Sequence, residues 1–181
     1  MRTVTSIAVH HSVSQFGDAA IIRGWHKAKG WKDIGYHAVV LNGQRKSNGA
    51  FKPSECGVVE AGRPESVMGA HVQGHNTGTL GICFIGDFDK NRPDPAQLLG
   101  GARQIAEWCR KYGLGAKDVK GHRQYNGHQS NHCPGQLFPL DALQRMVHEL
   151  LHTPPAESVR ACVRIGVERI PYRMEGDTAV A

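Results

Sequence analysis

Residues 121–135, which read GHRQYNGHQSNHCPG, hold the side chains best suited to bind a metal ion. His122 opens this segment, Cys133 lies near its end, and His128 and His132 lie between them. Imidazole nitrogens and cysteine thiolates are common protein ligands of borderline-soft divalent ions such as zinc. A loop can bring its first and last residues together, so His122 and Cys133 are candidate ligands of one ion.

A third ligand has to come from elsewhere, and the segment SIAVHHS at residues 6–12 offers one. Residues 5–11 favour a strand, and successive side chains of a strand point to opposite faces of the sheet. Only one of His10 and His11 can therefore face the same ion as His122. The alternative is that these histidines are merely solvated, because the chain contains 11 of them and short motifs produce chance matches.

Length and composition indicate one globular domain with a short appendage. The chain has 181 residues, of which 40% are hydrophobic and 21% charged, as is ordinary for soluble proteins. No stretch reaches the roughly 18 consecutive apolar residues of a membrane span. The N-terminus lacks the basic, apolar and small-residue regions of a signal peptide, so we expect cytoplasmic synthesis without an export signal.

The cysteines are odd in number and widely scattered, at Cys56, Cys83, Cys109, Cys133 and Cys162. This pattern argues against a disulfide framework and favours thiols in a reducing compartment. Cys83 and Cys109 stand among apolar residues, which predicts that they belong to the core.

The chain is basic, with a net charge of +6 and a pI near 9.2. A basic surface suits nucleic acid, membrane headgroups or an anionic polymer such as a bacterial cell wall, and charge alone leaves all three open. No nucleic-acid-binding motif is present and the basic residues are dispersed. We therefore expect no nucleic-acid partner.

Hydrophobic periodicity and capping residues predict a mixture of helices and strands. Helices are expected at about residues 19–29, 95–112 and 140–151, the first after an Asp18 cap and the second closed by Gly113. Strands are expected at about residues 5–11, 36–41, 58–61, 80–86 and 118–121. The apolar run LGICFIG at 80–86 is typical of a central strand buried on both faces. The predicted fold is α/β (α+β), with a mixed central β-sheet of about five strands flanked by helices.

The Pro154-Pro155 pair marks the predicted domain boundary. Residues 1–152 are expected to form the domain, and residues 153–181 a C-terminal extension. Within the extension, residues 159–170 partly alternate and suit either a strand added to the sheet edge or a loosely ordered tail.

Several short motifs occur together in a characteristic order: VHHS at 9–12, GWKDIGYH at 30–37, VEAGR at 59–63, GAH at 69–71, HN at 75–76, LGICFIGDF at 80–88, GHR at 121–123 and CPG at 133–135. In order and spacing they resemble the zinc-dependent N-acetylmuramoyl-L-alanine amidases (amidase type 2) of the bacteriophage-lysozyme and peptidoglycan-recognition-protein type. The resemblance covers roughly residues 6–150. It implies one zinc ion per chain and bacterial peptidoglycan as the partner, and we expect a monomer.

The resemblance assigns the zinc ligands to His10, His122 and Cys133, in agreement with the strand alternation. It places the active-site tyrosine at Tyr36. Without the resemblance, Tyr36 would be interpreted as a core tyrosine with a satisfied hydroxyl. Tyr36 and His37 face opposite ways in the predicted strand, so only one of them can line a site with His10.

The expected catalytic helper departs from the family's pattern. Active members typically have lysine or threonine two residues before the cysteine ligand, and this chain has Asn131 there. Asn131 cannot supply a proton to the leaving amine, so His132, His128 or a zinc-relayed water is expected to substitute. The loop between the last histidine and cysteine ligands is also longer than usual, which leaves its alignment open.

Arg63, His71 and Asn76 also fall within matched motifs. They are predicted to line the substrate groove, although a purely structural role fits them equally.

Three functions are compatible with the resemblance. The favoured one is a phage or prophage endolysin that acts on the cell wall after release through the inner membrane. A cytoplasmic muropeptide-recycling amidase is the second, although such relatives often have aspartate in place of Cys133. A non-catalytic peptidoglycan-binding module is the third, although such proteins commonly lose the cysteine ligand.

Overall fold

A five-stranded mixed sheet forms the centre of the domain in the computed structural model, which describes residues 2–153. The strands are β1 (Ser6–His11), β2 (Ala38–Asn42), β3 (Cys56–Ala61), β4 (Thr79–Phe84) and β5 (Val119–Gly121). Their order is β3-β2-β4-β1-β5, with β3 antiparallel to β2 and the other pairs parallel. The predicted fold class is confirmed. The strand or tail predicted at residues 159–170 lies outside the described residues.

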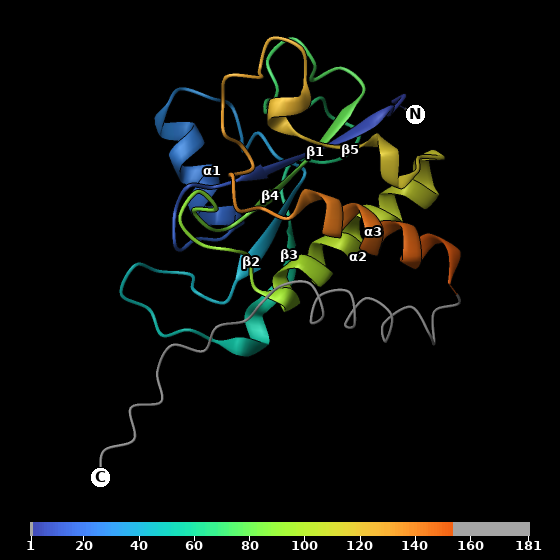
Figure 1. Ribbon diagram of the computed structural model, residues 1–181. Coiled ribbons are helices and arrows are strands. Elements are labelled where there is room, and N and C mark those ends of the chain that lie inside the picture. The colour runs from blue at the N-terminus through green and yellow to red at the C-terminus, as the bar shows by residue number, and fades with distance from the viewer. Residues whose placement is uncertain (1, 154–181) are drawn as a thin grey trace.

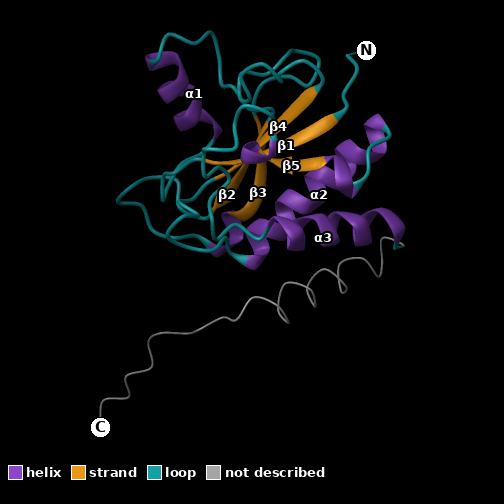
Figure 2. Ribbon diagram, turned by 45° about the horizontal axis from the view of Figure 1, so that its top comes forward, coloured by secondary structure: helices purple, strands orange, loops and turns teal. Residues whose placement is uncertain are grey.

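The helices cover the two faces of this sheet unequally. Helices α2 (Pro95–Tyr112) and α3 (Leu140–His152) pack together on one face, and α1 (Ala19–Ala28) lies on the other (Figures 1 and 2). Ile7 and Val9 of β1 belong to the larger apolar cluster under α2 and α3. Cys83 of β4 packs on the opposite face with residues of α1. Within residues 2–153, no helix has the length and apolar character needed to cross a membrane.

The sequence signals for helix ends agree with the structure. The Asp18 carboxylate accepts a hydrogen bond from the Ile21 amide at 2.8 Å, which caps α1, and Asp94 caps α2 through the Ala96 amide at 2.7 Å. Gly113 ends α2 in the left-handed conformation, with φ of 68°.

The central strands differ slightly from the prediction. Strand β4 lies in the middle of the sheet and every residue in it is buried, as the apolar run predicted. The second strand begins at Ala38 and not at the predicted Tyr36. The Tyr36 carbonyl accepts from the Arg63 amide and the His37 amide donates to Gly81, so both residues are held just before the regular ladder starts.

The prediction that Cys83 and Cys109 belong to the core is confirmed. Cys56, Cys83, Cys109 and Cys133 are all free, and Cys83 and Cys109 are buried in the core.

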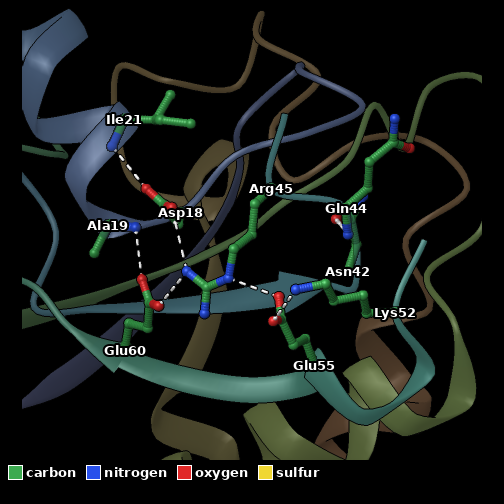
Figure 3. Close-up of polar contacts among 9 residues, drawn as sticks. All are labelled: Asp18, Ala19, Ile21, Asn42, Gln44, Arg45, Lys52, Glu55 and Glu60. Carbon is green, nitrogen blue, oxygen red and sulfur yellow. Dashed lines mark hydrogen bonds and ion pairs between the residues drawn. The ribbon is translucent and has the colours of Figure 1, made fainter. Parts of the chain in front are cut away.

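The long polar loop after β2 is anchored by one arginine. The Arg45 guanidinium bonds to Glu55 at 2.6 Å, to Glu60 of β3 at 2.6 Å and to Asp18 at 3.2 Å (Figure 3). Glu60 also accepts from the Ala19 amide at 2.9 Å. The loop is therefore joined both to β3 and to the start of α1, and the positive charge of Arg45 is neutralised locally.

Candidate active site

A cavity of about 540 Å³ opens near the carboxyl end of β1. Side chains from distant parts of the chain line it: His10, His26, Lys29, Trp31, Tyr36, Ala70, His71, Gln73, Asn76, His122, His128 and Cys133. None of these lining residues is aspartate or glutamate. Five imidazoles and one thiol therefore dominate its polar chemistry.

Three of the lining residues converge at one point. His10, His122 and Cys133 each offer a ligand atom, and these atoms all lie within 4.8 Å of one another. The Cys133 sulfur lies 3.5 Å from His10 Nδ1. Tetrahedral zinc bound at about 2.0–2.3 Å separates its ligand atoms by roughly 3.3–3.6 Å. The donor set and its spacing therefore fit zinc after small adjustments.

Different elements position the three residues. His10 is near the end of β1, and His122 directly follows β5, which pairs with β1. Cys133 is fixed by its backbone, because its carbonyl accepts from the Arg123 amide at 3.0 Å and its amide donates to Asn131 Oδ1 at 3.1 Å. The pairing of β1 with β5 thus fixes the positions of His10 and His122, and the loop that follows His122 brings Cys133 to them.

The strand alternation decides between the two adjacent histidines. His10 lines the cavity. His11 turns away from it, and its Nδ1 accepts a hydrogen bond from the Phe88 amide at 3.2 Å.

His10 and His122, the two candidate histidine ligands, each contact a further imidazole through Nε2. His10 Nε2 lies 3.2 Å from His71 Nδ1, and His122 Nε2 lies 3.1 Å from His128 Nδ1. Such outer contacts fix the ring orientation and the tautomer of a metal-binding histidine.

Burial sets the protonation of this cluster. It lowers the pKa of His10 well below its ordinary value and the pKa of His122 to about 4, with further lowering of both by neighbouring histidines. Burial raises the pKa of the Cys133 thiol to about 12. At neutral pH the imidazoles are therefore uncharged and able to bind a cation, whereas the thiol has to lose its proton when a cation binds.

Tyr36 lies beside the cluster. Its ring centroid is 5.1 Å from that of His10 and 5.4 Å from that of His26. Burial, together with the nearby Cys83 and Cys133, raises the pKa of the Tyr36 hydroxyl well above its usual value. The hydroxyl therefore keeps its proton and is a hydrogen-bond donor at neutral pH.

Two of the predicted groove residues line the cavity. His71 lies over Gly81, where an added Cβ would come within 2.7 Å of the imidazole ring. Its Nε2 is buried and has no hydrogen-bond partner within the described residues. Asn76 Oδ1 accepts from the amides of His71 and Val72 at 2.8 and 3.0 Å, so this amide side chain shapes the loop that carries His71.

Three other predicted residues do not reach the cavity. The Arg63 guanidinium donates to the carbonyls of Ile34 and Met68 and is engaged in holding two loops together. The His132 side chain is 61% exposed, with Nδ1 at 3.7 Å from an Asp89 carboxylate oxygen. Asn131 caps the Cys133 amide. The structure gives these three residues contacts that support the loops.

Sequence reasoning missed four further residues that line the cavity, His26, Lys29, Trp31 and Gln73. His26 is a buried residue of α1, and its Nδ1 accepts a hydrogen bond from the Gly35 amide at 2.9 Å. Trp31 packs against His26 with a centroid separation of 4.5 Å and remains 41% exposed. A tryptophan directly after Gly30, next to the predicted end of the helix, was the signal available in the sequence.

Comparison with known proteins agrees with this geometry. The fold and cavity define a mixed α/β domain with a His-His-Cys cluster that could hold a metal ion. The family model for N-acetylmuramoyl-L-alanine amidases matches residues 1–136, and the chain belongs to this family. The family predicted from the motifs is thereby confirmed.

Individual relatives include phage and animal proteins. The endolysin of Enterobacteria phage T3 is 37% identical over 104 residues, which are 53% of this chain and 60% of that protein. Peptidoglycan-recognition protein LB of Drosophila melanogaster is 32% identical over 113 residues, or 61% of this chain and 41% of that protein. The chain thus spans about half the length of these curated relatives.

The solved structure of the N-acetylmuramoyl-L-alanine amidase LysC from Clostridium intestinale is similar in fold. It has a TM-score of 0.67 and 26% identity, covering 80% of this chain and 85% of that one.

Proposed function

We propose that the chain hydrolyses the amide bond between N-acetylmuramic acid and L-alanine in peptidoglycan, with one zinc ion held by His10, His122 and Cys133. The observation that carries the proposal is the convergence of these three residues in a cavity near the carboxyl end of β1 in an amidase-family domain. Two imidazoles, one thiolate and an open fourth position are typical of catalytic zinc sites.

The metal and the protein have separate tasks in this proposal. Bound zinc supplies a Lewis acid that polarises a carbonyl and lowers the pKa of a coordinated water toward neutrality. The chain supplies a site of neutral imidazoles, so His10 and His122 need no deprotonation before they bind a cation.

Tyr36 is proposed to stabilise the charge that develops on the substrate carbonyl oxygen. Its hydroxyl keeps its proton, and its ring lies beside His10 of the metal cluster. A donor of this kind acts more strongly as the oxygen gains charge, and therefore favours the transition state over the bound substrate. His71 and Asn76 are proposed to form the adjacent wall against which the substrate lies.

The composition of the cavity supports amide over glycan hydrolysis. Glycosidases usually place two carboxylates on either side of the scissile bond. The described residues that line this cavity include no carboxylate.

The biological setting that we propose is that of a phage or prophage endolysin, since phage endolysins are among the relatives. Presence of Cys133 next to His10 favours catalysis over a purely peptidoglycan-binding role. The proposed route is cytoplasmic synthesis followed by release to the cell wall. Activity on polymeric wall but not on soluble muropeptides would distinguish an endolysin from a recycling amidase.

A single digest of purified sacculi tests the proposed reaction. Amino groups of L-alanine and reducing sugar ends are measured in parallel, with the wild-type chain and with Cys133→Ser as the matched control. New amino groups without new reducing ends are expected from the wild type only. New reducing ends without new amino groups would contradict the proposed reaction.

A further inference from the structure

His128 has contacts that no ligand role explains. It lies in the loop between His122 and Cys133 and lines the cavity. Its Nδ1 is 3.1 Å from His122 Nε2, and its Nε2 is 2.9 Å from the Gln73 carbonyl oxygen. The rings of His122 and His128 are 4.7 Å apart between centroids. Both nitrogens of His128 are therefore engaged.

These distances allow one consistent set of protons. The Gln73 carbonyl can only accept, so His128 Nε2 carries a proton and donates it. The His128 tautomer with its single proton on Nε2 has an unprotonated Nδ1, which accepts from His122 Nε2–H. The remaining nitrogen of His122, Nδ1, is thereby left without a proton and with a free lone pair, as metal binding requires.

A second contact joins the loop that carries Gln73 and His75 to the loop that carries Asn126 and His128. His75 Nε2 lies 3.0 Å from the Asn126 carbonyl oxygen, so each loop sends one imidazole to a carbonyl of the other. His75 does not line the cavity and contacts the ring of Tyr125, at 5.5 Å between centroids. The two histidines thus share the loop-joining role, but only His128 also touches His122.

We propose that His128 is a positioning residue, which fixes the orientation and tautomer of His122 and is itself anchored by the Gln73 carbonyl. The inference rests on the proposed function, because it assigns His122 as a zinc ligand. Within the loop between His122 and Cys133, the inference assigns the positioning role to His128. It assigns no proton transfer to His128, since both of its nitrogens are occupied.

The test measures zinc release and needs no substrate. Zinc-loaded wild-type protein is mixed with an excess of a chromogenic chelator, and the rate of zinc transfer is compared with that of His128→Ala, His128→Asn, His128→Gln and His75→Ala. The thermal midpoint of each metal-free variant checks that it is folded. Asparagine retains an acceptor near the Nδ1 position, whereas glutamine retains a donor near the Nε2 position.

Loss of an outer partner of a metal ligand typically weakens metal binding about 10- to 100-fold. His128→Ala is expected to release zinc about 10- to 100-fold faster than the wild type, and His75→Ala within about threefold of it. His128→Asn should recover part of the loss and His128→Gln little of it.

Three results would overturn the inference. One is wild-type zinc release from folded His128→Ala. Another is that His75→Ala accelerates zinc release as much as His128→Ala does, which would attribute the faster release to the loss of contact between the two loops. The third is a wild-type chain that binds no zinc, which would overturn the proposed function as well; the first two would leave that function standing.

Discussion

Replacing Tyr36 with phenylalanine removes one hydroxyl from the cavity and little else. The ring contacts with His10 and His26 are retained, since phenylalanine keeps the aromatic ring. The hydroxyl is a protonated donor at neutral pH because burial raises its pKa. We therefore expect Tyr36→Phe to keep its zinc and its fold and to lose turnover.

The size of the loss follows from the role proposed for the hydroxyl. Removing one preorganised donor to a developing oxyanion costs about 2.7–4 kcal/mol, or roughly 100- to 1,000-fold in kcat. Loss of an ordinary hydrogen bond costs about 0.5–1.5 kcal/mol of stability. The free-energy cost of Tyr36→Phe to turnover should therefore be much larger than its cost to the free energy of unfolding.

Tyr125→Phe is the matched control. The Tyr125 hydroxyl hydrogen-bonds the Ser6 hydroxyl at 3.0 Å in a buried position, and this tyrosine does not line the cavity. Initial rates of amino-group release from sacculi and zinc content per chain are measured for both variants. A Tyr36→Phe turnover within threefold of wild type, or a similar loss in Tyr125→Phe, would refute the role assigned to Tyr36.

Three further predictions concern the metal, the domain boundary and pH. Cys133→Ser should lose most of its zinc by elemental analysis and keep its circular dichroism spectrum, because the core clusters do not include Cys133; retention of stoichiometric zinc would count against the assignment. Truncation after Thr153 should leave a folded, zinc-loaded domain, because α3 ends at His152 and buries Leu143 and Val147 within the described core; insolubility or a much lower thermal midpoint would move the boundary. The metal-free chain should lose stability as the pH falls from 6.5 toward 4, since burial lowers the pKa of His26 and His37 from 6.5 to about 4. In this pH range each histidine takes up a proton in the unfolded chain but not in the folded one. The free energy of unfolding therefore falls by up to about 1.4 kcal/mol per pH unit for each histidine. Urea titrations at several pH values check this, and an unchanged midpoint across the window would contradict it.

Local sequence rules predicted the elements that carry the site. Alternation along β1 required His10 and His11 to separate, and the two do face different environments. Asp18 and Gly113 identified helix ends because capping depends on neighbouring residues alone. Family resemblance added Tyr36, which no local rule would have selected.

The conformation of the loop between His122 and Cys133 could not be predicted from local sequence rules. Sequence reasoning left His132 and His128 as alternatives for the helper, and of these two only His128 lines the cavity. Its position depends on the Gln73 carbonyl, which lies in a loop from a distant part of the chain. Contacts of this kind follow from tertiary structure, as does the burial of His26 beneath Trp31.

X-ray absorption at the zinc edge tests the proposed centre most directly. A chain loaded with one equivalent of zinc is expected to show one sulfur at about 2.3 Å and two imidazole nitrogens at about 2.0–2.1 Å, with a fourth light atom. Cys133→Ser should lack the sulfur contribution. A wild-type spectrum without sulfur, or one without imidazole scattering, would contradict the assignment of His10, His122 and Cys133 as the zinc ligands.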